Sequence, residues 1–154
     1  MWLLRVGTRG RWCRDGKPHD RLDPSIQDEL ERCTRDLTPR EQDDGKLSMY
    51  RVESEDEAVT VAEEWAMEKR ELDDDHLDYV LLPDSCFVPG EVAAVQDTDG
   101  SAKHHLLRER HYLVHETHEG GFRTLASRAL RHDELKIERI LRKDLKALRA
   151  SREG

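Results

Sequence analysis

The sequence has few apolar and aromatic residues. Hydrophobic side chains make up 36% of its 154 residues and aromatic side chains only 5%, whereas charged side chains make up 39%. A soluble domain is usually about 45–50% apolar, so the core of this protein must be lean. The length suits one domain of ordinary size.

Long uncharged runs are missing as well, the longest being the six-residue stretch 85–90. A membrane-spanning helix needs about 20 apolar residues. A signal peptide needs an apolar stretch of about 7–15 residues, and the apolar residues 2–4 are too few for one. The sequence therefore predicts a cytoplasmic protein that does not cross a membrane.

Cysteines are few and far apart. Cys13, Cys33 and Cys86 form no CxxC pair, which argues against a disulfide framework and against a cysteine-based zinc site. The chain also lacks a GxSxG motif, a Walker-type glycine loop and a dinucleotide-binding GxGxxG motif. We therefore expect no cofactor, and no catalytic motif points to an enzyme.

Charge is abundant but unevenly distributed. The net charge of the whole chain is −8, made up of +4 over residues 1–22, −17 over residues 23–102 and +5 over residues 103–154. Segregation of this kind is typical of proteins that meet a partner through a charged surface. A strongly acidic middle between two basic ends is the main compositional signal.

Hydrophobic periodicity predicts strands at 2–6, 47–53 and 77–82, with helices at 24–37 and 54–71. Asp23-Pro24 and the Ser54–Glu57 capping box mark the two helix starts. The strand, helix and strand across 47–82 form a βαβ unit, whose two strands should be parallel. The expected core stripes of the helices are Ile26, Leu30, Cys33 and Leu37, and then Ala58, Ala62, Trp65 and Ala66.

Beyond this unit the pattern predicts strands at 92–96, 104–107 and 111–116, with 122–126 left open, and a helix over 131–150. The fold class is therefore α+β or a small α/β sheet, in a single domain. Within it we expect a short strand and basic loop (1–22), an acidic α/β core (23–130) and a cationic amphipathic helix (131–150).

The predicted C-terminal helix is the strongest functional candidate. At 100° per residue its leucines gather on one side and its basic residues on the other. An amphipathic helix can simply cover the core, or it can dock onto a partner. The residues expected to bind the partner are Leu141, Leu145, Leu148, Arg139, Arg142, Lys143, Lys146 and Arg149.

The N-terminal basic loop is a second candidate surface. Arg9, Arg11, Trp12 and Arg14 combine cations with an aromatic ring, a combination that suits single-stranded nucleic acid because bases stack on the ring. The same composition is more typical of a mobile, solvated arm, because the pattern lacks an RNP-type motif. The acidic middle of the chain would repel phosphate unless it faces away.

Histidines near the middle of the chain invite a metal hypothesis. His111, His115 and His118 would share a face of a helix, but the segment reads as a strand, on which only His111 and His115 share one. Recognisable zinc-ligand spacing is absent, so we predict no metal site.

A nuclease-like motif is also incomplete. Pro83-Asp84 followed by Glu134-Leu135-Lys136 is similar to the PD-(D/E)xK nuclease signature, but the triplet falls in the predicted C-terminal helix rather than on a nearby strand. The carboxyl ends of the predicted parallel strands, near residues 53–54 and 84–85, are where an α/β fold usually places a ligand.

Together these patterns favour a small cytoplasmic, non-catalytic subunit or adaptor that binds a protein partner. The second hypothesis is a nucleic-acid-binding or nucleic-acid-processing accessory protein that uses both basic ends. Two further hypotheses stay open, namely an enzyme with an unrecognised site near Asp84 and association of the chain with a second copy of itself.

Overall fold

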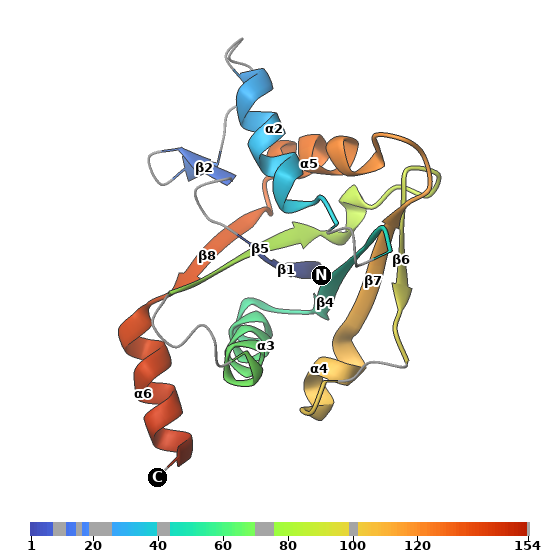
Figure 1. Ribbon diagram of the computed structural model, residues 1–154. Helices are drawn as coiled ribbons and strands as arrows, with labels where there is room; N and C mark the ends of the chain where they lie inside the picture. Colours follow the sequence, from blue (N-terminus) through green and yellow to red (C-terminus); the bar gives the residue numbers. More distant parts are fainter. Residues whose placement is uncertain are drawn as a thin grey trace.

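A six-stranded sheet, in which every strand is antiparallel to its neighbours, forms the centre of the computed structural model (Figure 1). The order of the strands is β6–β7–β4–β1–β5–β8. The structure describes residues 1–7, 12–14, 17–18, 26–39, 44–69, 76–98 and 102–153.

The elements follow one another with short connections. The sheet consists of β1 (Trp2–Val6), β4 (Lys46–Val52), β5 (Leu77–Pro83), β6 (Val92–Gln96), β7 (His111–Glu116) and β8 (Lys136–Ile140). A separate strand pair, β2 (Cys13–Arg14) and β3 (Lys17–Pro18), lies in the segment expected to be loop. The helices are α2 (Ile26–Asp36), α3 (Glu55–Glu68), α4 (His105–Arg110), α5 (Gly121–Arg131) and α6 (Arg142–Glu153), with the short 3₁₀ helix η3 (Asp84–Cys86).

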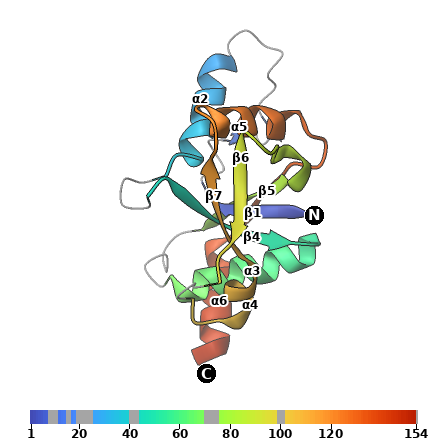
Figure 2. The ribbon, with the colours of Figure 1, turned by 90° about the vertical axis from the view of Figure 1, so that its right-hand side faces the viewer.

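Helices cover both faces of the sheet (Figure 2). We call the face under α2 and α5 the upper face and the face over α3, α4 and α6 the lower face. Side chains alternate between the two faces along each strand, so two cores form. The upper core includes Leu3, Met49, Val80, Cys33 and Leu125, and the lower core includes Leu4, Val52, Leu81, Ala62 and Leu145. The protein is thus a single α+β domain.

The βαβ unit is confirmed, with one difference. β1 lies between β4 and β5 and pairs antiparallel with both, placing Trp2 opposite Val52 on one side and Pro83 on the other. β4 and β5 therefore run parallel to each other without touching. The sequence predicted their direction, but the insertion of β1 is a long-range arrangement that no local pattern shows.

Helix α3 begins where the capping pattern predicted. The Ser54 side chain accepts a hydrogen bond from the Glu57 N–H (3.1 Å), and the Glu57 carboxylate accepts one from the Glu53 N–H (3.4 Å). The stripe of small residues on α3 is buried in the lower core, and Trp65 is partly buried against it. The predicted α2 stripe is likewise confirmed for its described members, Leu30, Cys33 and Leu37. Asp23-Pro24 and the Ile26 side chain lie outside the described residues and side chains.

The predicted helix over 131–150 is wrong in its first half. Residues 136–140 form strand β8 on the outer edge of β5, and α6 begins only at Arg142. Ile137 and Ile140 pack into opposite cores, as strand alternation requires. Residues 136–140 form a strand because β5 is buried along its whole length, and the backbone groups on its outer edge need hydrogen-bond partners.

Two smaller expectations also change. Residues 104–107, predicted as strand, fall mostly within helix α4, and residues 122–126 lie in helix α5. In both helices the apolar residues Leu107 and Leu125 are buried against the sheet. Within the described residues, no helix is long and apolar enough to span a bilayer.

Candidate functional site

Helix α6 is held firmly against α3 by its inner side. Leu145 is only 1% exposed and packs in the lower core. Arg149 donates a hydrogen bond to the Ala66 carbonyl (3.2 Å), and Arg152 makes two hydrogen bonds to the Glu64 carboxylate (2.9 and 2.5 Å). The inner side of α6 is therefore part of the domain.

The outer side of α6 is cationic. Arg142, Lys143 and Lys146 are all exposed, and at 100° per residue they fall within an arc of about 100°. Leu141, immediately before the helix, is 47% exposed beside them. We call these four residues, Leu141, Arg142, Lys143 and Lys146, the basic patch.

The remaining residues predicted to bind a partner do not join this patch. Leu145 is buried, and Leu148 and Arg149 are partly buried on the inner side. Arg139 belongs to β8 and makes an ion pair with Asp78. The structure thus brings together only half of the predicted set, because three of the other four residues lie on the inner side of α6 and the fourth, Arg139, belongs to β8.

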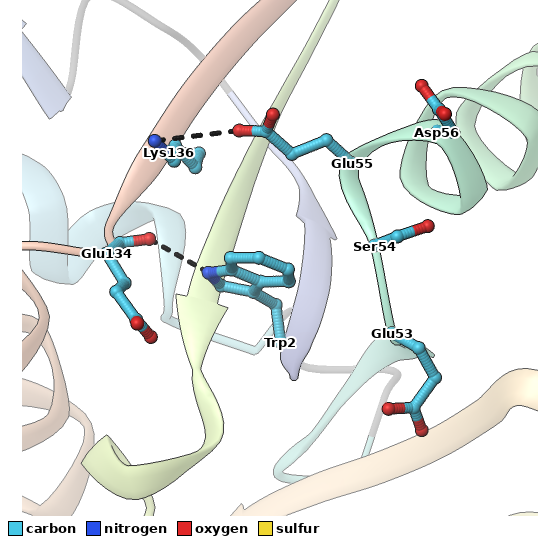
Figure 3. Close-up of a pocket in the computed structure, with 7 residues that line it drawn as sticks. All are labelled: Trp2, Glu53, Ser54, Glu55, Asp56, Glu134 and Lys136. Atoms are coloured by element: carbon cyan, nitrogen blue, oxygen red, sulfur yellow. Dashed lines mark hydrogen bonds and ion pairs between the residues drawn. The ribbon is translucent and has the colours of Figure 1, made fainter.

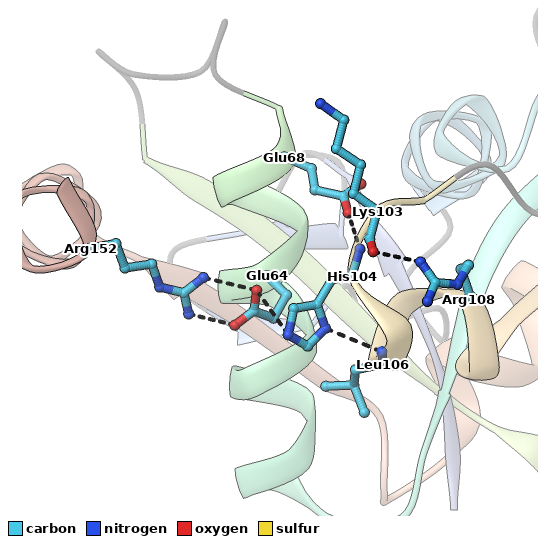
Figure 4. A network of polar contacts seen from close by, with 7 residues as sticks. All are labelled: Glu64, Glu68, Lys103, His104, Leu106, Arg108 and Arg152. Atoms are coloured by element: carbon cyan, nitrogen blue, oxygen red, sulfur yellow. Dashed lines mark hydrogen bonds and ion pairs between the residues drawn. The ribbon is translucent and has the colours of Figure 1, made fainter.

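A polar network joins α6, α3 and α4 (Figure 4). The His104 backbone N–H donates to the Glu68 carboxylate (2.7 Å), and the His104 Nδ1 accepts from the Leu106 N–H (3.2 Å). Its Nε2 lies 3.6 Å from the Glu64 carboxylate. Hydrogen bonds from Arg152 lower the pKa of Glu64 below its usual range. This network ties the lower helices together and has a structural role.

Trp12, the aromatic residue of the N-terminal basic loop, is not available for stacking. Trp12 is 1% exposed, and its indole N–H donates to the Asp36 carboxylate (2.7 Å). A base cannot stack on a ring that lies inside the upper core, so the stacking contact suggested for Trp12 does not fit its position in this structure. Arg9 and Arg11 lie outside the described residues, and of Arg14 only the backbone, in β2, is described.

A polar pocket of about 540 Å³ lies where β4 ends and α3 begins (Figure 3). It is lined by Trp2, Glu53, Ser54, Glu55, Asp56, Glu134 and Lys136. The Trp2 indole N–H donates to the Glu134 carbonyl (2.8 Å), and Lys136 lies 3.6 Å from the Glu55 carboxylate. With four carboxylates and one ammonium in its lining, the pocket repels phosphate groups.

The nuclease-like motif is not assembled in the structure. Glu134 and Lys136 stand at the start of β8, not on a helix, and line the polar pocket on the lower face. Asp84 lines a separate 240 Å³ pocket with Leu3, Arg51 and Tyr112. Among the described residues, no group of three or more His, Cys, Asp and Glu side chains is placed to hold a metal ion.

Two serine–histidine pairs occur among the described residues, and the first is unsuited to catalysis. Ser85 Oγ lies 3.0 Å from His132 Nε2, while His132 Nδ1 accepts a hydrogen bond from the Glu134 N–H (3.1 Å). Because Nδ1 is the acceptor, a neutral His132 carries its proton on Nε2 and donates it to Ser85. That tautomer cannot take a proton from the serine.

The second pair has a carboxylate behind it. Ser48 Oγ lies 2.9 Å from His111 Nε2, and His111 Nδ1 lies 2.9 Å from the Asp97 carboxylate. The sequence drew attention to His111 only as a metal ligand. Ser48 and Asp97 carry no motif, and only the pairing of β4, β6 and β7 brings the three residues together.

No protein-family model matches the chain, and neither the curated proteins nor the solved structures give a match. Function must therefore be inferred from the residues of this chain alone.

Proposed function

We propose that the protein is a small cytoplasmic subunit or adaptor that binds another protein through the basic patch on α6. The observation that carries this proposal is the division of α6 into two sides. Leu145, Arg149 and Arg152 hold the inner side to the domain. The outer side presents three exposed cations, and the half-exposed Leu141 directly precedes them in the chain.

The chemistry of the patch defines the partner. Three cations within one arc of a helix attract an acidic protein surface and speed its approach. Leu141 offers an apolar contact next to these cations, and protein interfaces combine apolar contacts with polar ones in this way. The partner surface should therefore carry several carboxylates around a shallow apolar site.

A protein partner is favoured over nucleic acid. Burial of Trp12 removes the only described aromatic ring of the basic N-terminal segment from the surface. Sequence-independent binding to nucleic acid would then rest on phosphate contacts alone. The strongly acidic middle of the chain, with a net charge of −17 over residues 23–102, opposes such contacts.

The experiment compares two charge-reversal variants. One carries Arg142→Glu, Lys143→Glu and Lys146→Glu. The matched control carries Arg32→Glu, Arg35→Glu and Arg131→Glu, which change three exposed arginines of α2 and α5 and shift the net charge by the same amount. Partners that co-purify with the wild type are identified, purified and titrated against all three proteins.

We expect the α6 variant to lose at least about tenfold in affinity, a change of 1.4 kcal/mol, with the control close to wild type. The wild-type affinity should fall as salt is added, because exposed charges are screened. An α6 variant that binds as tightly as the wild type would contradict the proposal. Salt-dependent binding of labelled RNA or DNA with no protein partner would favour the nucleic-acid hypothesis instead.

A further inference from the structure

We propose that Ser48 is a catalytic nucleophile for acyl transfer, activated by His111 and positioned through Asp97. The three side chains are linked in one hydrogen-bonded line from the Ser48 hydroxyl through the His111 ring to the Asp97 carboxylate. This site lies on the lower face at the β4–β7–β6 end of the sheet, away from the basic patch. It is independent of the proposed binding function.

The proposal depends on which nitrogen of the His111 ring holds the proton. A carboxylate only accepts hydrogen bonds, so Asp97 requires His111 Nδ1 to hold the ring proton. The lone pair of His111 Nε2 then faces Ser48 Oγ at 2.9 Å and accepts its proton. A base within hydrogen-bond reach of the hydroxyl, itself oriented by a third group, is the arrangement that activates a serine.

The fold holds the histidine ring in place. Asp97 lies directly opposite His111, and the Asp97 backbone N–H donates to the His111 carbonyl (2.9 Å). On its other side the His111 ring lies against the buried Tyr50 ring, with centroids 5.3 Å apart and planes tilted by 34°. His111 and Asp97 are partly buried, whereas Ser48 is exposed and open to a substrate.

The Ser85–His132 pair shows how specific this geometry is. Both pairs join a serine hydroxyl to a histidine Nε2 at hydrogen-bond distance. In the Ser85 pair the second ring nitrogen accepts a backbone N–H, and in the Ser48 pair it faces a carboxylate. Only the second pair has the tautomer of a general base, so the first serves as an internal control.

An apolar strip beside Ser48 indicates the substrate class. In the strand register Leu113 stands opposite Ser48, and Val95 stands opposite Leu113, all on the lower face. Val95 is 56% exposed, the highest value among the large apolar side chains described as exposed. An apolar acyl group extending from Ser48 would lie along this strip, so the expected substrates are esters or thioesters with such a group.

The reaction balances without a cofactor. Ser48 Oγ attacks the carbonyl carbon as His111 Nε2 takes the hydroxyl proton. The bond to the leaving oxygen or sulfur then breaks, and His111 returns the proton to that atom. Water, deprotonated by His111, then attacks the acyl carbon, the bond from that carbon to Ser48 Oγ breaks, and His111 returns the proton to Ser48 Oγ, which restores the free enzyme. The Asp97 carboxylate stabilises the imidazolium that forms in each step.

The test measures covalent labelling and ester hydrolysis. A fluorophosphonate, which phosphonylates activated serines with loss of fluoride, is incubated with the full chain, and the labelled residue is located by mass spectrometry. Release of nitrophenol from 4-nitrophenyl acetate, butyrate and octanoate is followed in parallel. The variants are Ser48→Ala, His111→Gln and Asp97→Asn, with Ser85→Ala and His132→Gln as controls.

We expect labelling at Ser48 and none at Ser85. Ser48→Ala should abolish labelling, and His111→Gln should slow it by about 100-fold or more, the usual contribution of a general base. Both controls should behave as wild type. Hydrolysis should be faster for longer acyl groups, and Val95→Ser should remove that preference. Absence of label on Ser48, or a labelling rate that His111→Gln leaves unchanged, would overturn the proposal.

The test of Asp97 needs a measurement that would not change if Asp97 served only the stability of the fold. Nitrogen-15 spectra of the His111 ring should show the proton on Nδ1 in the wild type and a mixture of tautomers in Asp97→Asn. The labelling rate should fall by about tenfold or more in the same variant, with an unchanged melting temperature. Wild-type spectra with the proton on Nε2 would refute the mechanism even if Ser48 reacts.

Discussion

Asp78 and Arg139 face each other across the β5–β8 pair, and the guanidinium binds both oxygens of the carboxylate. The two hydrogen bonds measure 2.6 Å from Arg139 Nε and 3.1 Å from Arg139 Nη2. Asp78 is only 7% exposed. A bidentate pair at this position holds β8 in register with β5, because a slip by one residue would move Arg139 to the other face.

Replacing Arg139 by Met should therefore destabilise the domain by about 1–3 kcal/mol, since a buried carboxylate loses two charged donors. The measurement is the free energy of unfolding in urea. Lys136→Met on the same strand is the matched control, because Lys136 and Glu55 form an exposed pair 3.6 Å apart. That pair should contribute less than about 1 kcal/mol. Equal losses in the two variants would show that Arg139 does not secure the register.

The position of α6 gives a second prediction. Leu145→Ala should cost about 2–5 kcal/mol, as expected for truncating a fully buried leucine. Leu141→Ala should change stability by less than about 0.5 kcal/mol, because that side chain is largely exposed. Thermal and urea unfolding of both variants would check the helix phase. A large loss of stability in Leu141→Ala, with no loss in Leu145→Ala, would mean that α6 is rotated from the orientation described.

The Glu64–Arg152 pair predicts a dependence of stability on pH. Arg152 lowers the pKa of Glu64 below the ordinary glutamate value of 4.5 in the folded state. The pair therefore stabilises the fold above that value, and the benefit disappears as the pH falls through the lower, folded-state pKa. The difference in unfolding free energy between wild type and Arg152→Gln should be present at about pH 6 and should shrink towards about pH 3. A difference that stays constant over this range would argue against the ion pair.

Trp12 should act as a core residue rather than as a contact for nucleic acid. Trp12→Phe keeps an aromatic side chain but replaces the buried indole by a smaller phenyl ring and removes the donor to the Asp36 carboxylate, which is itself buried. We expect a loss of about 1–3 kcal/mol in the free energy of unfolding. A double-mutant cycle with Asp36→Ala, which removes the acceptor, should give a non-zero coupling energy, as it does for residues in contact. Additive effects of the two changes would show that the hydrogen bond contributes nothing.

Local patterns predicted the parts of the fold that local chemistry determines. The Ser54 cap and the apolar run of 77–82 identified α3 and β5, because a capping side chain and a bounded apolar run act over a few residues. The spacing of Ile137, Leu141, Leu145 and Leu148 also satisfies a helix, yet the first of these belongs to a strand. Residues 136–140 form a strand because they pair with the outer edge of β5, and β5 is distant in sequence.

The candidate sites follow the same rule. The basic patch lies within six consecutive residues, so its members could be predicted from the sequence. The sequence could not separate them from neighbouring residues that are buried in the structure. Ser48, Asp97 and His111 come from three different strands or strand ends. Their meeting depends on the register of β4, β6 and β7, which no single stretch of sequence specifies. His111 alone was noticed, and for a different chemistry.

The central place of β1 has a consequence for how the domain folds. Its residues must find Val52 on one side and Pro83 on the other, so loops of about 50 and about 80 residues have to close before the middle of the sheet exists. Such distant pairings slow folding, and refolding should take milliseconds to seconds rather than microseconds. Until β1 inserts, β4 and β5 each expose an unpaired edge. The partly folded chain is then most prone to strand exchange between molecules. Refolding at high protein concentration should therefore yield swapped dimers, and refolding at low concentration should not.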